Sequence, residues 1–279
     1  MITMNNFHFK YAGSDCFALQ NINLTIKEGE FVGVIGNSGA GKSTLTYAIN
    51  GVIPHHYHGD FYGDVSVDGM STVEVTPEQL SACVGSVFQD IDGQMVASVV
   101  EDELLFGLEN FGFVREEITQ RIDDALATMG IADLRYRSIC TLSGGQKQKV
   151  ALAAILALKP RILVLDEPTG ELDPQSSGQI FTMLRELNQT YGITVVVVEQ
   201  KIMLLCEYVK RLIVMGEGSI LLDGEVHEVL EHSKEMEAVG IHIPRVATLA
   251  NLLIDKGLYL GRLPRNLDEA EAMVREVMA

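Results

Sequence analysis

Residues 36–43 have the types and the spacing that phosphate binding requires. They run Gly36, Asn37, Ser38, Gly39, Ala40, Gly41, Lys42 and Ser43, followed by Thr44. Glycines let consecutive backbone N–H groups turn toward an anion, and a helix that begins at such a loop adds its positive end. Lys42 would then reach the β- and γ-phosphates, and the Ser43 hydroxyl would ligate Mg²⁺. Residues 36–44 are therefore predicted to bind a nucleotide.

Two acidic residues, Asp166 and Glu167, close the run 161–165, which is apolar after Arg161. Such a run suits a strand that is buried on both faces of a parallel sheet, and ligands bind at the carboxyl ends of such strands. Asp166 would hold the Mg²⁺ shell, and Glu167 would polarise the water that attacks the γ-phosphate. Two acids after a strand could also form a solvated turn. Beside a phosphate-binding loop they favour a phosphoryl-transfer site.

Strands and helices alternate along the chain in a way that would position these residues. The phosphate loop lies between the apolar run 31–35 and a helix that begins near residue 44, and a valine strand covers 194–198. These elements predict an α/β protein with a parallel core sheet. Further strands are expected at 22–26, 63–69 and in a hairpin over 212–220, and helices at 115–129 and 175–191.

Together, several motifs resemble the ATP-binding cassette (ABC) family. They are the phosphate loop, the signature 142–146, Asp166-Glu167-Pro168-Thr169, and Glu171-Leu172-Asp173-Pro174. The resemblance implies that Gln89 senses Mg²⁺ and the γ-phosphate and that Tyr11 stacks on adenine. The nucleotide site implied by the family also includes Ser143, Gly144, Gly145, Gln146 and Asp173, and its Mg²⁺ would be held by Ser43, Gln89 and Asp166.

The resemblance also implies the architecture and the activity. It predicts a P-loop NTPase of ABC type: a RecA-like parallel core sheet, an antiparallel β subdomain and a helical signature subdomain at about 76–142. The ATPase domain would cover 1–225, and a small helical region at 226–279 would serve dimerisation or docking. The expected reaction is hydrolysis of ATP with Mg²⁺, coupled to transport across a membrane.

One position departs from the family pattern. Members usually carry a histidine after the strand that follows the acidic one, but this chain has Gln200. A glutamine amide can donate to a phosphate oxygen, but it cannot carry a positive charge. Two interpretations stay open: Gln200 slows hydrolysis at this chain's own loop, or it replaces the histidine as a neutral donor. Glu167, Gln200 and Gln89 are the predicted catalytic residues.

Dimerisation is implied, because in the family the signature of one subunit completes the site of the other. The altered position 200 favours a heterodimer with a paralogue over a homodimer. Stretches at 88–95, 101–110, 244–250 and 267–270 resemble energy-coupling factor (ECF) transporter ATPases. That subfamily would add a transmembrane scaffold and a substrate-binding membrane protein that releases a vitamin or a transition-metal ion. An ATPase of another ABC importer or exporter is the alternative. Acidic residues expected to face the scaffold are Asp90, Asp92, Glu101 and Asp102.

Composition agrees with an intracellular, peripheral protein, and the resemblance implies a place at the cytoplasmic face of the cell membrane. The formal net charge of −17 repels nucleic acid, which argues against a soluble ABC ATPase of DNA repair or translation. No apolar run approaches the length of a membrane helix, and the N-terminus resembles no secretory signal.

The run His55-His56-Tyr57-His58 could bind a metal, but the Pro54 and Gly59 beside it favour a connecting loop. The four cysteines form no CxxC pair, which favours reduced thiols.

Overall fold

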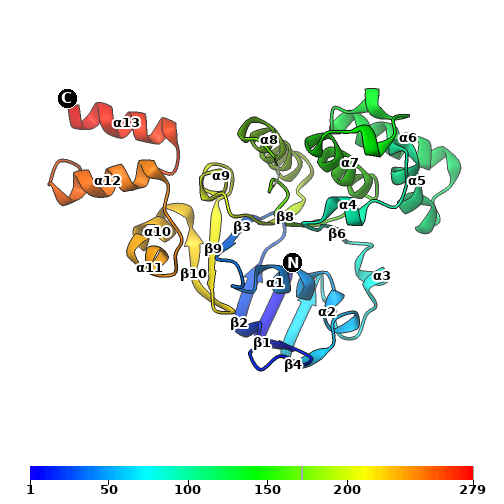
Figure 1. Cartoon of the computed structure of the whole chain (residues 1–279), viewed down its shortest axis with the longest axis horizontal. Coiled ribbons are helices and arrows are strands. Elements are labelled where there is room, and N and C mark those ends of the chain that lie inside the picture. Colours follow the sequence, from blue (N-terminus) through cyan, green and yellow to red (C-terminus); the bar gives the residue numbers. More distant parts are fainter. Residues whose placement is uncertain (171, 279) are drawn as a thin grey trace.

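A computed structural model describes residues 1–170 and 172–278. Glu171, from the motif at 171–174, and Ala279, the end of the expected C-terminal region, lie outside the described residues. Two sheets organise the chain (Figure 1). The larger sheet contains β3 (Phe31–Gly36), β6 (Val84–Val87), β7 (Ile162–Asp166), β8 (Thr194–Val198), β9 (Arg211–Gly216) and β10 (Ser219–Glu225). The smaller contains β1 (Ile2–Tyr11), β2 (Leu19–Ile26), β4 (Gly59–Val67) and β5 (Met70–Ser71).

The larger sheet has the strand order β10-β9-β3-β8-β7-β6. All its neighbouring strands pair in parallel except β9 and β10, which form an antiparallel hairpin. The smaller sheet, in the order β2-β1-β4-β5, is antiparallel throughout. The predicted α/β class, with a parallel core sheet and an antiparallel β part, is confirmed.

The core sheet is covered on both faces, and β8 shows how the sequence achieves this. Val196 and Val198 pack in one cluster with α1 (Lys42–Ile49) and the antiparallel sheet. Val195 and Val197 belong to the opposite cluster, which includes α8 (Pro174–Tyr191) and α9 (Ile202–Tyr208). Side chains alternate between the faces of a strand, so a strand buried on both sides needs an unbroken apolar run.

Helices beyond the core form two groups at opposite ends of the molecule in Figure 1. One group contains α4 (Ile91–Gln94), α5 (Val100–Asn110), α6 (Arg115–Thr128) and α7 (Gly144–Ala157). The range 76–142, expected to be helical, also contains β6, which pairs with β7 in the core sheet. This strand has only four residues, which is too short for its period to be distinguished from that of a helix. Shorter helices are α2 (Val52–His55) and α3 (Pro77–Leu80).

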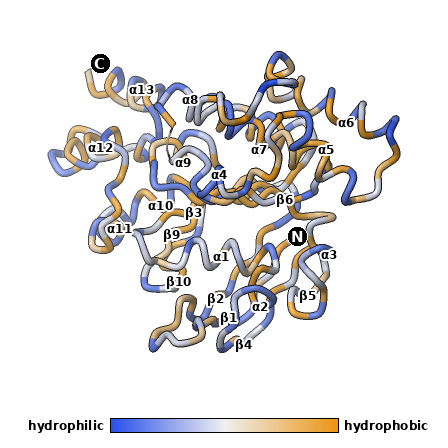
Figure 2. Tube along the Cα trace, turned by 45° about the vertical axis from the view of Figure 1, so that its right-hand side comes forward, coloured by the Kyte–Doolittle hydropathy of each residue, from blue (hydrophilic) through white to orange (hydrophobic). Residues whose placement is uncertain are grey.

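The C-terminal group follows β10 directly. It contains α10 (Val226–Glu231), α11 (Ser233–Ala238), α12 (Arg245–Asp255) and α13 (Leu267–Met278). Hydrophobic and hydrophilic residues alternate along α12 and α13 in Figure 2. Among the described residues, no helix combines the length and the apolar character needed to cross a bilayer.

Candidate nucleotide-binding site

The phosphate loop leaves the end of β3 and enters α1, as the sequence predicts. Gly41 is the N-cap of α1 with φ of 95°, and a Cβ there would lie 2.6 Å from the Ala18 carbonyl oxygen. Only glycine fits this position without strain. The Lys42 side chain folds back over the loop and donates to Gly36 O at 2.7 Å and to Asn37 O at 3.0 Å. Burial lowers the pKa of the Lys42 ammonium, and the Glu167 and Asp166 carboxylates oppose this shift.

Asp166 lies at the end of β7, where its side chain is only 4% exposed. Its Oδ1 atom is buried without a hydrogen-bond partner among the described residues, and the Ser43 hydroxyl is the neighbour that lowers the pKa of this carboxyl. Burial raises the pKa of Asp166; the neighbouring Glu167 raises it further, and the Ser43 hydroxyl lowers it. A buried carboxylate oxygen without a partner, next to a hydroxyl, is the oxygen-rich arrangement that Mg²⁺ prefers. The residues present therefore fit this ion.

Glu167 is held between two side-chain amides. Gln89 Nε2 donates to Glu167 Oε2 at 3.2 Å, and Gln200 Nε2 donates to Oε1 at 2.7 Å. The backbone N–H of Glu167 donates to Val198 O at 2.9 Å, and its φ of 50° is rare for a residue other than glycine. Gln89 follows β6, Glu167 follows β7 and Gln200 follows β8, which are adjacent strands. The sheet therefore brings all three side chains to one edge.

A cavity of about 910 Å³ opens at this edge. Its lining includes Asp166, Glu167, Gln89 and Gln200 from the core, and Gly144 from the first turn of α7. Another cavity, of about 790 Å³, between α6 and α8, is lined by none of the predicted site residues. The chemistry predicted from the sequence is therefore concentrated at the carboxyl end of the core sheet.

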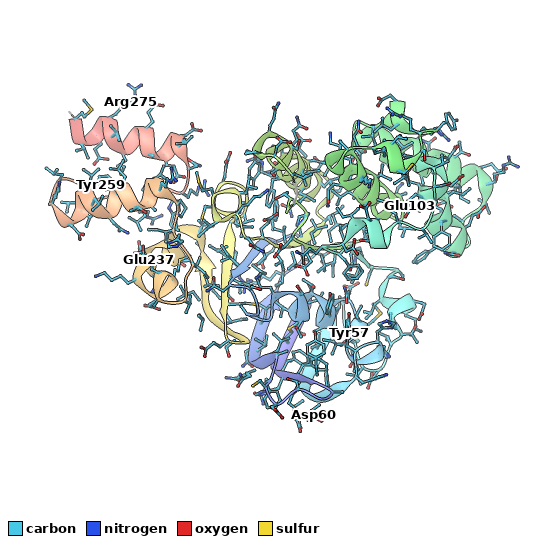
Figure 3. The ribbon with its side chains drawn as sticks, viewed as in Figure 1. Tyr57, Asp60, Glu103, Glu237, Tyr259 and Arg275 are labelled. Atoms are coloured by element: carbon cyan, nitrogen blue, oxygen red, sulfur yellow. The ribbon has the colours of Figure 1, made fainter. Side chains whose placement is uncertain are left out.

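Tyr11 ends β1, and its hydroxyl lies 3.1 Å from Thr44 Oγ1. The ring of Tyr11 meets the ring of Tyr57 edge-on at 5.7 Å between centroids, and Tyr57 in turn stacks on Tyr47 at 5.2 Å. Burial raises the pKa of the Tyr11 hydroxyl. Figure 3 labels Tyr57 near the antiparallel sheet. Sequence reasoning considered only the histidines of the run 55–58 and missed its tyrosine, because no periodicity links position 57 to position 11.

The signature residues begin α7. Ser143 is the N-cap: its hydroxyl accepts from the Gln146 N–H at 3.4 Å, and Gln146 Oε1 accepts from the Ser143 N–H at 3.0 Å. Ser143 and Gly144 are exposed, while Gly145 and Gln146 are half-buried. Ser143, Gly145 and Gln146 line a separate cavity of about 230 Å³ rather than the one that contains Glu167. The structure therefore does not join these three residues to this chain's own phosphate loop.

Asp173 is the N-cap of α8. Its Oδ1 atom accepts from the backbone N–H groups of Gln175 at 2.9 Å and Ser176 at 3.0 Å, and its Oδ2 atom accepts from the Ser176 hydroxyl at 2.5 Å. The Ser176 hydroxyl and these N–H groups hold the pKa of Asp173 below its usual value. Asp173 is exposed at this helix start, and among the described residues its side-chain hydrogen bonds stay within α8 and do not reach the phosphate loop.

Two charged residues beside Gln200 were missed as site residues. Glu199 is only 1% exposed, and Lys201 lines the same cavity as Glu167. A charged residue that directly follows a fully buried valine strand was the available signal, because a buried charge requires hydrogen-bond partners.

Comparisons with known proteins agree with this geometry. The family model for ABC transporters matches residues 19–170. The chain is 41% identical to a putative ABC transporter ATP-binding protein of Pyrococcus abyssi over 258 residues, or 92% of each chain. It is 35% identical to the energy-coupling factor transporter ATP-binding protein EcfA1 of Clostridium novyi, over 96% of this chain and 95% of the relative.

A solved structure is similar over most of the chain. It is CbiO1 of Clostridium perfringens, described as part of the ABC transporter complex CbiONQ. The TM-score is 0.76 at 32% identity, over 90% of this chain and 98% of CbiO1. The chain thus belongs to the ABC transporter ATPase family, in which it is similar to ECF-type ATP-binding subunits.

Proposed function

We propose that this chain is the ATP-hydrolysing subunit that energises an ECF-type importer for a vitamin or a transition-metal ion. The observation that carries the proposal is the placement of Glu167 between the Gln89 and Gln200 amides, next to Asp166 with its unpartnered Oδ1 atom. A general base must be fixed toward the atom on which it acts, and two neutral donors fix a carboxylate without neutralising it.

The residues divide the reaction between them. Gly36 to Thr44 would bind the triphosphate of ATP, and Lys42 would exchange its loop carbonyls for phosphate oxygens. Bound Mg²⁺, held by Ser43, Gln89 and Asp166, would supply charge neutralisation at the phosphates. Glu167 would accept a proton from the attacking water, and Tyr11 would stack on the base. The residues proposed to contact ATP from the partner subunit are Ser143, Gly144, Gly145, Gln146 and Asp173.

Dimerisation with composite sites is supported by the exposed signature. Ser143 and Gly144 lie at the surface at the start of α7, where a helix N-terminus favours an anion. In a dimer this end would face the partner's ATP. A heterodimer is favoured because a paralogue with histidine at the position of Gln200 would supply the group that this chain lacks. The region 226–279 would support the dimer or its docking, and its exposed apolar residues include Leu249, Leu252, Leu260 and Leu267.

Coupling to a membrane scaffold is proposed for the surface around α4 and α5. Asp92 pairs with Lys147 at 2.6 Å, and Glu101 pairs with Arg135 at 2.6 Å, so these two acids already have intrachain partners. Asp90 caps α4, while Asp102 is exposed. Apolar side chains are also exposed here: Val96, Phe106, Phe111 and Val114. An apolar surface with an acidic edge would suit a scaffold helix at the cytoplasmic face of the membrane.

The deciding experiment measures ATP hydrolysis by the chain alone and by the chain mixed with its candidate paralogue and scaffold. We expect strong turnover only in the mixture, and its loss in Glu167→Gln and in Ser143→Arg. Leu221→Ala, at an exposed position on β10, serves as the control. Robust turnover by the chain alone, indifferent to the scaffold, would instead indicate a self-sufficient soluble ATPase.

A further inference from the structure

The residues on both sides of Gln200 hold the chain that follows Glu167. Glu199 Oε1 accepts from the Thr169 N–H at 3.0 Å and from the Thr169 hydroxyl. The other carboxylate oxygen, Oε2, accepts from the backbone N–H groups of Gln200 at 3.0 Å and Lys201 at 3.4 Å. This buried carboxylate therefore has four hydrogen-bond partners, and it joins the end of β8 to the chain after β7.

The Lys201 ammonium completes the connection from the other side of Thr169. It donates to Thr169 O at 2.5 Å, to Leu172 O at 3.0 Å and to Ser177 Oγ at 3.1 Å. Thr169 and Ser177 are both fully buried. Thr169 is thus held at its N–H by Glu199 and at its carbonyl by Lys201. We call these two side chains with their partners the Glu199–Lys201 clamp.

Counting donors decides what Lys201 can do. An ammonium group has three N–H donors, and the three acceptors above use all of them. Lys201 therefore has no donor left for a phosphate oxygen, although it lines the same cavity as Glu167. It does not replace the positive charge that Gln200 lacks. Its role is to hold the backbone carbonyls of Thr169 and Leu172 in place.

The backbone that the Glu199–Lys201 clamp holds lies next to two proposed site residues, Glu167 and Asp173. Thr169 lies two residues after Glu167, and Leu172 directly precedes Asp173. Gln200, between the two clamp residues, donates to Glu167 itself. Three consecutive residues thus hold the general base, the chain after it and the first turn of α8.

We propose that Lys201 is a positioning residue for ATP hydrolysis, which fixes the backbone at Thr169 and Leu172 and so orients Glu167 and Asp173. The inference rests on the proposed function. Misplacing a catalytic group by about 1 Å can cost about a hundredfold in rate, so loosening this backbone should lower kcat. Nucleotide affinity should change little, because the three acceptors of the Lys201 ammonium all lie outside the phosphate loop.

The test compares kcat and nucleotide dissociation constants in the full chain with its partner subunits. Lys201→Met keeps the length of the side chain but removes the ammonium, and Ser177→Ala removes one acceptor. We expect kcat to fall about tenfold or more in Lys201→Met and less in Ser177→Ala, with mant-ADP binding unchanged in both. The double variant should be no slower than Lys201→Met alone, because both changes act through one group. Lys210→Met, at an exposed position after α9, is the matched control.

The outcomes separate this inference from the proposed function. If the parent assembly hydrolyses no ATP, the proposed function fails. If the parent is active and Lys201→Met keeps its kcat, the clamp inference is overturned. It is also overturned if kcat and nucleotide binding fall together, because that pattern indicates general loss of structure. Should Lys201→Met fail to fold, Ser177→Ala decides, and parent-like turnover in that variant would overturn the inference.

Discussion

Gln200 Nε2 donates to Glu167 Oε1 at 2.7 Å, across the ends of adjacent strands β8 and β7. The amide at the position where the family usually has histidine is thus directed at Glu167, the proposed general base. A neutral donor at this distance orients the carboxylate and leaves its negative charge in place. Gln200 therefore acts on the protein's own carboxylate in addition to any contact with phosphate.

Removing this donor should slow hydrolysis. In Gln200→Ala we expect kcat to fall about tenfold, because Glu167 would keep only the longer bond from Gln89. The dissociation constant for mant-ADP should stay close to that of the parent, since the hydrogen bonds of the Gln200 N–H and amide go to Glu199 and Glu167 and not to the phosphate loop. Steady-state turnover and a fluorescence titration measure the two quantities. A parent-like kcat in Gln200→Ala would show that the amide does not orient Glu167.

Gln200→His separates the two interpretations that the sequence leaves open. A neutral imidazole can still donate, so we expect turnover at pH 8 close to that of the parent. Below the ordinary histidine pKa of about 6.5 the ring would add a positive charge that glutamine cannot supply. A rate at pH 8 far above that of the parent would contradict the neutral-donor role and indicate a weakened native site.

Asp166 should make the stability of the nucleotide-free chain depend on pH. Its pKa is raised by burial, so the folded state binds the proton more tightly than the unfolded state. Its contribution to stability is therefore fully present below the ordinary aspartate value of 3.8 and is lost as pH rises through the raised value. At pH 7 we expect Asp166→Asn to unfold at a higher temperature than the parent.

Asp166→Asn removes the cost of burying a charged carboxylate. A gain of about 1 kcal/mol in the free energy of unfolding would raise the thermal midpoint by roughly 2–4 °C in a chain of this size. The difference between variant and parent should shrink at pH 4, and Mg²⁺ with ATP should stabilise the parent but not the variant. Asp102→Asn, at an exposed acid, should show no such difference. A lower midpoint for Asp166→Asn at pH 7 would contradict the assignment of burial as the dominant cause.

Much of the fold follows from local patterns in the sequence. The strand expected at 194–198 is β8, and the helix expected at 175–191 is α8, which begins one residue earlier. Both have strong signals: an unbroken valine run, and Asp173 with Pro174 at a helix start. The four-residue β6 lacks such a signal, because its parallel pairing with β7 links residues far apart in the chain.

The candidate site was predictable in its residue types but not in its contacts. The roles expected of Lys42, Asp166 and Glu167 depend on motifs that are contiguous in sequence. The Glu199–Lys201 clamp and the contact between Tyr57 and Tyr11 join segments that only the fold brings together. Spacing along the chain carries no information about such pairs, which depend on sheet order and on loop conformation.

Tyr57 should influence nucleotide affinity through Tyr11. Its ring packs edge-on against Tyr11 and stacks on Tyr47, so it limits the positions that the Tyr11 ring can take. In Tyr57→Ala we expect affinity for mant-ATP to weaken by about threefold to tenfold, in line with the loss of about 1 kcal/mol from aromatic contacts. Tyr57→Phe keeps the ring and should bind as the parent does. Equal weakening in both variants would rule out a packing role.

The exposed apolar side chains of α5 and α6 and their flanks predict where the proposed scaffold would bind. Phe106 on α5 is 49% exposed, and Val114, directly before α6, is 62% exposed. A carboxylate at either position would have to be desolvated in an apolar interface, so Phe106→Asp should abolish co-purification with the scaffold while ATP binding persists.

Leu221→Asp, at a similarly exposed position on β10, should leave co-purification intact. Because Asp92 is paired with Lys147, Asp92→Asn should have a smaller effect than Phe106→Asp. If Phe106→Asp retained the scaffold and Leu221→Asp lost it, the docking surface would lie on the hairpin side of the core sheet instead.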